Sequence, residues 1–256
     1  MKSRFEQLHA EWVIEYTKLK QNRIITLVEA GHADLSHYKA FLRQCYFNTR
    51  DTPIIMTRFA SKVKHDDYGI LRKFIRHAAS ETGHHLLAQQ DLANLGEDVS
   101  SLSVTLSPPT TQALSAFILH CIDNLNPVAY LGYCYHLEAL AVYGGGDNIK
   151  LFKALGIPEN ALTFLTEHAD ADPGHLRLMI DYLKSFVHTQ ADWEAVLYGL
   201  RGSCALYGVM LDGMMNECSP ISDPSNSQAG MQTPAKKPAT DWSAKPAPSP
   251  VGTKPK

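Results

Sequence analysis

Residues 130–146, YLGYCYHLEALAVYGGG, decide the fold class of this chain. Apolar and aromatic side chains fill nearly every position, without the alternation of apolar and polar residues that indicates a half-buried strand. A segment of this length and composition predicts a helix that is buried on all sides. Glu138 lies in its middle, and a buried carboxylate is costly unless it is paired, hydrogen-bonded or bound to a metal. The segment therefore predicts a helical core and marks a candidate functional residue within it.

The rest of residues 1–218 has helical patterns almost throughout, which predicts an all-α bundle of about seven long helices. Prolines and glycines place the expected breaks. Pro53 should kink or break the second helix, residues 144–146 (GGG) should interrupt another, and Pro127 and Pro158 suit first helical turns. The expected helices cover residues 3–29, 36–64, 67–95, 110–124, 127–143, 147–155, 158–170, 173–187 and 190–217.

Residues 219–256 differ in composition from the rest of the chain. Eight of the 14 prolines lie here, together with five lysines, two aspartates and few large apolar side chains. Such a segment cannot bury enough surface to offset its ordering entropy, so we predict a disordered tail after a single domain of residues 1–218. The tail carries a charge of +3 (five minus two), so residues 1–218 carry −5 (−2 minus +3).

The overall composition is ordinary for a soluble globular protein, with 45% hydrophobic and 20% charged residues and a net charge of −2. These values give no reason to expect nucleic acid or a membrane as a partner. The first residues, MKSRFEQLHAEW, lack the apolar stretch of a signal peptide, so we expect a cytoplasmic protein. The five cysteines form no CxxC pair and are expected to be reduced, mostly buried thiols.

Two short segments contain residues that can bind metals. In ETGHH, residues 81–85, Glu81 and His84 are three apart and should share one helical face, which is how helical bundles present iron ligands. His85 competes with His84 for this role, and a solvated helical face explains the same spacing. In HADADPGH, residues 168–175, a stripe is formed at i, i+4 and i+7 by His168, Asp172 and His175. Alternatively Asp172, which precedes Pro173, caps a new helix.

Three carboxylates and three imidazoles thus come from three separated helical segments. Such a mixed set suits non-haem iron or manganese better than zinc or copper. Six ligands match two metal ions, with one carboxylate able to bridge them. Glu138 also has a second interpretation, a buried salt bridge to an Arg or Lys on another helix. The candidate ligands are Glu81, His84, Glu138, His168, Asp172 and His175.

This pattern resembles the haem-oxygenase-like diiron oxidases and oxygenases, a family also described as iron-containing redox enzymes. The family pattern is a Glu and a His on one helix, a Glu on a later helix, and then His-x3-Asp-x2-His. Here Glu81-x-x-His84, Glu138 and residues 168–175 fit it in that order. The resemblance covers roughly residues 5 to 215, and the Pro173–Gly174 pair departs from a smooth helix.

The resemblance implies a haem-oxygenase-like bundle that binds two Fe(II) ions, or manganese, and uses O2 as co-substrate. Glu81, Glu138 and Asp172 would be the catalytic carboxylates. Known activities in the family are N-oxygenation, oxidative C–C or C–N cleavage and decarboxylation, often in natural-product biosynthesis. We therefore expect an oxidoreductase acting on a small amino-acid-like or carboxylic substrate. The sequence leaves a homodimer open.

Three residues are candidates for substrate binding. Arg201 lies in an apolar segment and Arg177 follows His175 by two residues, and either can clamp a carboxylate bidentately. Tyr135 is a candidate pocket residue, although aromatic side chains at helical spacing usually form core. For Arg201 the alternative is a buried ion pair with Glu138.

Two other classes of function compete with the metal-dependent oxidase. One is a metal-free enzyme of the same fold, of the thiaminase-like or quinone-cofactor-forming type, for which Cys134 near Glu138 is the only indication. The other is a helical scaffold whose functional part is the tail, which leaves the buried Glu138 unexplained. A haem oxygenase would need an axial histidine near the first helix, where His9 is the candidate.

Overall fold

The computed structural model describes residues 2–64 and 67–218, except for the side chains of residues 170–173. Within these ranges the chain forms nine α-helices, one short 3-10 helix and no strand, which confirms the all-α prediction. The predicted disordered tail, residues 219–256, lies outside the described residues. No helix in the described ranges is long and apolar enough to cross a membrane.

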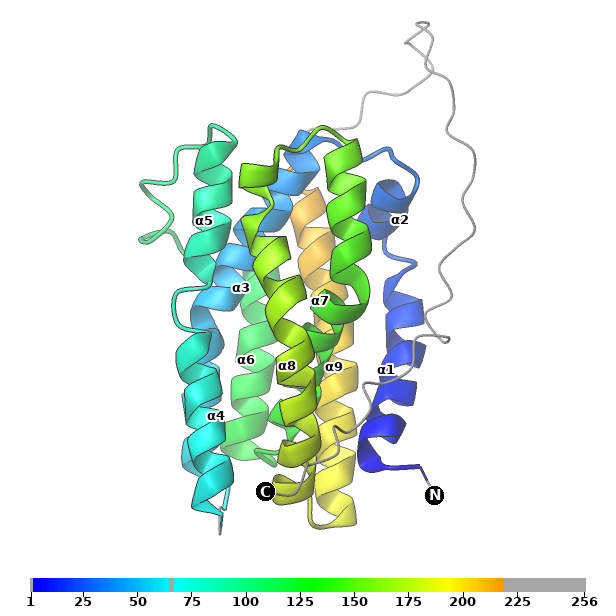
Figure 1. Cartoon of the computed structure of the whole chain (residues 1–256), viewed down its shortest axis with the longest axis vertical. Helices are drawn as coiled ribbons and strands as arrows, with labels where there is room; N and C mark the ends of the chain where they lie inside the picture. Colours follow the sequence, from blue (N-terminus) through cyan, green and yellow to red (C-terminus); the bar gives the residue numbers. More distant parts are fainter. Residues whose placement is uncertain (1, 65–66, 219–256) are drawn as a thin grey trace, which may run out of the picture.

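The long helices run along the long axis of the molecule, with α7 inside the bundle (Figure 1). Helix α7 packs against α8 and α9, and α9 also packs against α6 and α1. Helices α4 and α5 lie end to end on one side, and both pack on α3. The bounds are α1 Arg4–Leu19, α2 Arg23–Glu29, α3 Leu35–Lys62, α4 Tyr68–Ser80, α5 His85–Asn94, α6 Pro109–Asn124, α7 Ala129–Ala154, η1 Glu159–Ala161, α8 Thr163–Phe186 and α9 Gln190–Met215.

Several predicted breaks were wrong. Helix α3 continues through Pro53, so a break is absent there and the alternative, a kink, stays a prediction. Helix α7 continues through residues 144–146, where a Cβ at Gly145 would lie 3.1 Å from the Cβ of Ala169 in α8. The backbone of α8 is also helical through Pro173, so the break expected before that residue is absent. Conversely, the expected helix 3–29 is divided, because the side chain of Asn22 accepts from the N–H of Ile24 and caps a new helix.

The expected helix 67–95 is divided into α4 and α5 by a turn over residues 81–84. Gly83 has a φ of +97°, in the left-handed region that favours glycine. Glu81 is the C-terminal cap of α4, and His84 directly precedes α5. This turn therefore places two candidate ligands at a helix junction instead of on a continuous helical face.

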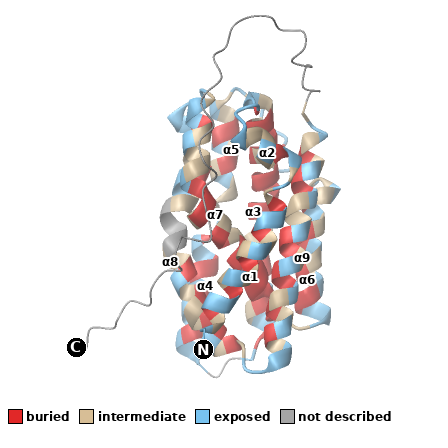
Figure 2. Cartoon of the chain, turned by 90° about the vertical axis from the view of Figure 1, so that its right-hand side faces the viewer, coloured by how far each residue is buried: buried red, intermediate tan, exposed pale blue. Residues whose placement is uncertain are grey.

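Buried residues lie on the inward faces of the helices (Figure 2) and form two apolar clusters. The larger cluster joins α1 and α9 to α4, α6, α7 and α8. The smaller one joins the first half of α3 to α5 and to the segment around η1. Since α4 contributes to the larger cluster and α5 to the smaller one, the 81–84 turn lies where the two clusters meet.

Glycines allow the tightest contact in the bundle, between α7 and α9. A Cβ added to Gly199 would overlap the carbonyl oxygen of Ala129, and one added to Gly132 would overlap that of Val196. The backbones of the two helices therefore approach each other directly, and a side chain at either position would push them apart. This contact fixes α7, the helix that carries Glu138.

A buried carboxylate joins α5 to the start of α8. Asp91 accepts hydrogen bonds from the N–H and hydroxyl of Thr163, at 3.2 and 2.6 Å, and from the N–H of Phe164, at 2.9 Å. These amide groups have no partner within the first turn of α8, so Asp91 caps that helix from another element. The link holds the helix with His168 and His175 beside the one that follows His84.

Candidate metal centre

Five of the six predicted ligands converge on one site between α4, α5, α7 and α8. Glu81 and His84 come from the α4–α5 junction, Glu138 from the middle of α7, and His168 and His175 from α8. The sixth, Asp172, is in α8, but its side chain lies outside the described part of the chain.

The structure adds a histidine that was not among the predicted ligands. Nε2 of His77 lies 3.2 Å from Oε1 of Glu138 and 3.8 Å from Oε1 of Glu81. The signal in the sequence was its spacing, because His77 precedes Glu81 by four residues and shares a helical face with buried Phe74. The predicted Glu81–His84 pair therefore lacked the ligand one helical turn earlier.

The ligand atoms form two groups that share Glu81. The first consists of His77, Glu81 and His175, and the second of Glu81, His84 and His168, with the ligand atoms of each group within 4.8 Å of one another. Glu138 borders the first group, since its Oε2 lies 3.2 Å from Nδ1 of His175. Glu81 is therefore placed to contact two metal ions.

Two buried nitrogens support a metal over a network of hydrogen bonds. Nε2 of His77 and Nδ1 of His84 are buried and have no hydrogen-bond partner. Each is close to a carboxylate oxygen, His84 at 3.1 Å from Oε2 of Glu81, but neither contact has the alignment of a hydrogen bond. Orphaned ring nitrogens beside carboxylates are what a mixed imidazole and carboxylate metal site requires.

Hydrogen bonds orient at least two of the imidazoles from behind. Nδ1 of His168 lies 2.7 Å from the carbonyl oxygen of Phe164. A carbonyl only accepts, so Nδ1 carries the proton and Nε2 keeps a lone pair for a metal. Behind His77, the hydroxyl of Tyr182 lies 3.4 Å from Nδ1. These partners set the ring orientations through residues outside the ligand set.

The charges of the site also favour a cation. Burial alone would raise the pKa of Glu138, but the hydrogen bond with His175 and the close contact with His77 outweigh burial and hold that pKa below its usual range. Burial lowers the pKa of His168, which keeps its imidazole neutral. The contact with Glu81 raises the pKa of His84, with burial opposing it. An ionised Glu138 and a neutral His168 are both in the protonation state that binds metals.

The structure distinguishes His84 from His85 as the ligand, and it bears on whether Glu138 forms a salt bridge. The ring of His85 packs edge-on against Tyr46, with centroids 5.3 Å apart, and it belongs to neither ligand group among the described residues. Glu138 has His77 and His175 as its neighbours and forms no ion pair with an arginine or lysine within the described ranges.

Two of the three predicted substrate residues have partners away from the metal centre. Arg201 is exposed and pairs with Glu11 of α1, its Nε 2.7 Å from the carboxylate, so it neither clamps at this site nor pairs with Glu138. Arg177 is exposed on α8. Tyr135 is fully buried against α1, where its hydroxyl lies 2.8 Å from Nδ1 of His9. The predicted substrate contacts of Arg201 and Tyr135 find no support in the structure, that of Arg177 stays a prediction, and His9 has a partner in Tyr135.

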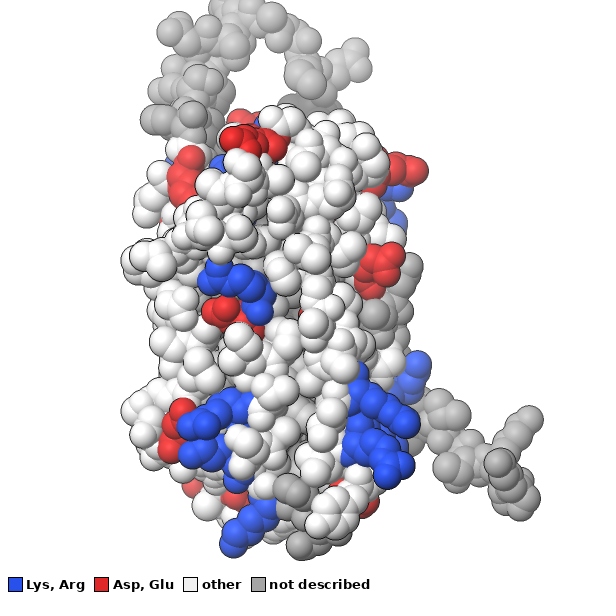
Figure 3. All heavy atoms as spheres, turned by 90° about the vertical axis from the view of Figure 1, so that its left-hand side faces the viewer, with Lys and Arg blue, Asp and Glu red and all other residues white. Residues whose placement is uncertain are grey.

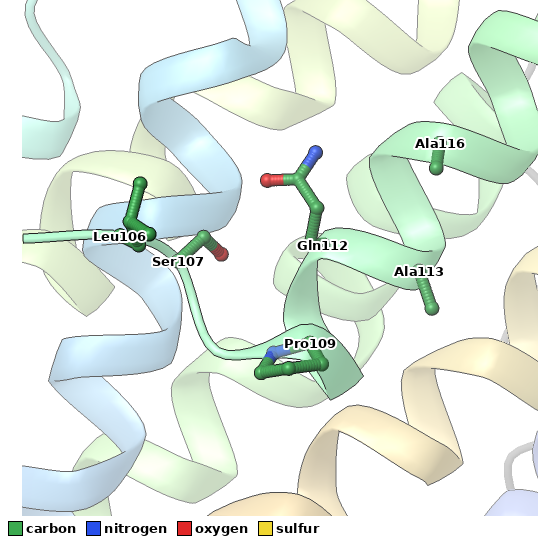
Figure 4. Close-up of a pocket in the computed structure, with 6 residues that line it drawn as sticks. All are labelled: Leu106, Ser107, Pro109, Gln112, Ala113 and Ala116. Carbon is green, nitrogen blue, oxygen red and sulfur yellow. The ribbon is translucent and has the colours of Figure 1, made fainter.

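A surface hollow of about 470 Å³ lies at the start of α6 (Figure 4). It is lined by small, apolar and amide side chains and holds no histidine or carboxylate: Leu106, Ser107, Pro109, Gln112, Ala113 and Ala116. With none of the candidate ligands among its lining residues, it has no part in the chemistry of the metal centre.

Comparison with known proteins agrees with the ligand pattern. Residues 39–208, which include every candidate ligand, match the family described as iron-containing redox enzymes. The chain belongs to this family. The resemblance inferred from the sequence is thereby confirmed. Membership makes iron the expected metal and oxidation or reduction the expected chemistry of this iron-containing redox enzyme. No curated protein matches the chain.

Solved structures confirm the haem-oxygenase-like fold. A domain of unknown function with a heme oxygenase-like fold from Shewanella denitrificans is 26% identical, with a TM-score of 0.74, and the match covers 83% of this chain and 90% of that one. A TenA homologue from Pseudomonas syringae is 13% identical, with a TM-score of 0.67 and coverages of 82% and 92%. A CADD-like protein of unknown function from Nostoc punctiforme is 17% identical, with a TM-score of 0.60 and coverages of 84% and 94%. The last two show the fold alone.

Proposed function

We propose that this iron-containing redox enzyme is a non-haem diiron, O2-dependent oxidase or oxygenase acting on a small organic substrate. The observation that carries the proposal is the shared position of Glu81 in two ligand groups. A carboxylate has two oxygens and can bind one ion with each. The first ion would be held by His77, Glu81, Glu138 and His175, and the second by Glu81, His84 and His168 with Asp172 as a further candidate.

Bound iron would supply the electrons and the open coordination positions at which O2 reacts. The protein's own residues hold that chemistry in place. Glu138 and Glu81 provide negative charge at a buried position, only 9% and 8% exposed. The side chain of His84 is more open, at 24% exposed, so the second group faces the side from which a substrate can enter.

The expected amino-acid-like or carboxylic substrate needs a cation other than Arg201 or Arg177. Arg50 of α3 is the candidate, because its charge contributes, after burial, to lowering the pKa of His85, the neighbour of His84. Its side chain is 30% exposed, its Nε lies 3.4 Å from the carboxylate of Asp51, and its guanidinium group packs over the ring of Phe47. We include in the proposal that Arg50 binds the carboxylate of the substrate.

The test is anaerobic loading of the purified protein with Fe(II), followed by mixing with O2. We expect two irons per chain, a transient visible absorption band and O2 consumption. Iron uptake of one ion or none, with no reaction with O2, would contradict the proposal. With a substrate identified from a screen of amino acids and small acids, Arg50→Gln should raise KM by about tenfold with a smaller change in kcat.

A metal-free enzyme of the same fold is the second candidate. Cys134 is buried, and its Sγ lies 3.9 Å from Oε1 of Glu138, which is a thiol beside a carboxylate. Two of the similar structures are TenA homologues, at 13% identity each. Substitution distinguishes the candidates: Cys134→Ser should leave O2 consumption by the iron-loaded protein within about twofold, whereas it should abolish the activity of a thiol-dependent enzyme.

A further inference from the structure

Basic residues concentrate in a short part of the chain. Residues 57–77 hold six of the 24 lysines and arginines and two acidic residues, in a domain with a net charge of −5. Figure 3 shows blue side chains gathered on the lower part of the molecule, at the level of α4 in Figure 1. The six are Arg58, Lys62, Lys64, Arg72, Lys73 and Arg76.

Arg58, Lys62 and Lys73 form ion pairs, whereas Lys64, Arg72 and Arg76 form none with any residue in the described ranges. Arg58 pairs with Asp123 at 2.6 Å, and Lys73 pairs with Asp181 at 2.9 Å. Arg72 and Arg76 are exposed and have no ion pair with any residue in the described ranges. They are one helical turn apart on α4, so their guanidinium groups are presented together to solvent.

Two large apolar side chains accompany these arginines. Tyr68 is 74% exposed and Ile75 is 50% exposed. Together with Arg72 and Arg76 they form one stripe along α4, which we call the α4 outer face. Exposed aromatic and aliphatic side chains flanked by arginines are typical of protein interfaces and unusual on a surface that faces only water.

The opposite side of the same helix reaches the metal centre. His77 directly follows Arg76, yet it is 3% exposed and points to Glu138. A helix with its side chains is about 10–12 Å across. A group seated on the α4 outer face is therefore separated from the first ligand group by little more than the thickness of α4.

The proposed reaction requires electrons from outside the protein. Reduction of O2 to two waters takes four electrons and four protons, and a two-electron oxidation of the substrate supplies half of them. For an oxygenation, SH + O2 + 2e⁻ + 2H⁺ gives SOH + H2O. The two remaining electrons must come from a reductant that returns the iron to Fe(II) after each turnover.

We infer that the α4 outer face docks an acidic, one-electron carrier protein, which passes electrons through α4 toward His77. Carboxylates of the carrier pair with Arg72 and Arg76, and an apolar spot beside them covers Ile75 and Tyr68. Such a contact is small, fast and steered by charge, as expected for a transient redox complex. The inference rests on the proposed diiron function for its purpose, but the docking itself can be measured separately.

The experiment uses a plant-type [2Fe–2S] ferredoxin, which is strongly acidic, as the probe. Its binding to the full-length, iron-loaded chain is followed by NMR titration, and O2 consumption is measured with reduced ferredoxin as the electron source. The test variant is Arg72→Glu with Arg76→Glu. The control, Arg23→Glu with Lys150→Glu, makes the same change in charge at exposed positions on α2 and α7.

We expect the test variant to weaken ferredoxin binding and ferredoxin-supported O2 consumption by at least tenfold, and the control to change both by less than about twofold. Raising the salt from about 50 to 300 mM should weaken wild-type binding, because exposed charges are screened. Reduction by dithionite bypasses the α4 outer face, so both variants should then match wild type.

No binding by wild type, or equal losses in test and control variants, would overturn the inference. The inference would also be overturned if the wild-type chain did not bind ferredoxin but bound anionic lipid vesicles or duplex DNA through Arg72 and Arg76. If instead the proposed function is wrong, the chain should consume no O2 even with dithionite as the reductant. In that case the binding titration still decides whether the α4 outer face docks an acidic protein.

Discussion

Nε2 of His77 lies 3.2 Å from Oε1 of Glu138, and the other nitrogen of the same ring lies 3.4 Å from the hydroxyl of Tyr182. A hydroxyl both donates and accepts. In the metal-free protein Tyr182 can donate to Nδ1, while a cation on Nε2 would require Nδ1 to carry a proton and donate to Tyr182. The tyrosine hydroxyl can therefore form a hydrogen bond with Nδ1 of His77 both in the metal-free and in the metal-bound protein. A carboxylate in its place could only accept, and so could form this bond only when Nδ1 carries a proton.

Tyr182→Phe should weaken metal binding at the first ligand group. Without the hydroxyl, the protonated Nδ1 of metal-bound His77 has no partner at 0% side-chain exposure. Loss of such a supporting hydrogen bond typically lowers metal affinity by roughly 10–100-fold. Equilibrium titration with Mn(II), followed by EPR, should show one weakened and one unchanged ion.

Tyr38→Phe is the matched control for that variant. Tyr38 is also fully buried, and its hydroxyl donates to the carbonyl oxygen of Ala161 at 2.8 Å, away from the metal centre. Both variants should lose about 1 kcal/mol of unfolding free energy. If Tyr38→Phe weakened Mn(II) binding as much as Tyr182→Phe, the effect would be one of general stability, and the role given to Tyr182 would be wrong.

Glu81→Ala should remove both metal ions, whereas His168→Ala should remove one. The reason is that Glu81 belongs to both ligand groups and His168 only to the second. Metal content after loading and desalting, measured by plasma mass spectrometry, checks the stoichiometry. His85→Ala is the control, since His85 lies against Tyr46 and should leave the metal content unchanged. Equal loss in Glu81→Ala and His168→Ala would argue against a shared carboxylate.

Two alanine substitutions of glycine should have opposite effects on stability. Gly199→Ala would place a methyl group on the carbonyl of Ala129, and separating α7 from α9 should cost several kcal/mol. Gly146→Ala, in α7, meets nothing within 4 Å and should add about 1 kcal/mol through helix propensity. Urea unfolding measures both. A destabilised Gly146→Ala would mean that residues 144–146 need flexibility within the helix.

Acid should destabilise the fold through Asp192 at the start of α9. Partial burial would raise its pKa, but hydrogen bonds from Asn126, Thr189 and His188 lower it to about 2 from an ordinary value of 3.8. A pKa depressed in the folded state contributes stability above the unfolded pKa and loses it as the pH falls through the folded one. Unfolding free energy should therefore drop between about pH 4 and 2.

Asp192→Asn separates this contribution from that of other acids. The variant should be less stable at neutral pH by about 1 kcal/mol, because the hydrogen bonds to an amide are weaker. It should also lose less stability than wild type on acidification to pH 2. An acid dependence that is identical in the two proteins would show that other carboxylates control the transition.

The fold class was predictable because hydrophobic burial leaves a direct record in the sequence. The apolar segment of α7 and its single carboxylate indicated both a buried helix and a site, and the i, i+4, i+7 spacing in α8 placed His168 and His175 together. Helix breaks were less predictable. Gly145 lies within a helix, where it packs on Ala169, a residue far along the chain. Helix propensity depends on local sequence and does not include such a contact.

The contacts of charged side chains depended on tertiary structure even more. Arg201 sits among apolar and small residues, which suggested a buried clamp, yet the position faces Glu11 of α1 at the surface. The ligand role of His77 depends on Glu138 of α7, which lies 3.2 Å from its Nε2 and whose position across the helices no local spacing gives. Local spacing indicates which side chains share a face of one helix, but the partners across helices are set by packing.

The bond from Asp91 to the first turn of α8 has a consequence for how the centre is assembled. It ties the helix that follows His84 to the helix that carries His168, so the gap between these imidazoles is fixed when the chain folds. The loss of conformational entropy that brings the ligands together thus occurs in folding, before any ion arrives. The affinity for metal is then governed by the coordination of the ions by these ligands. Removing the ions with a chelator should leave the protein folded, with its ligand residues still in place.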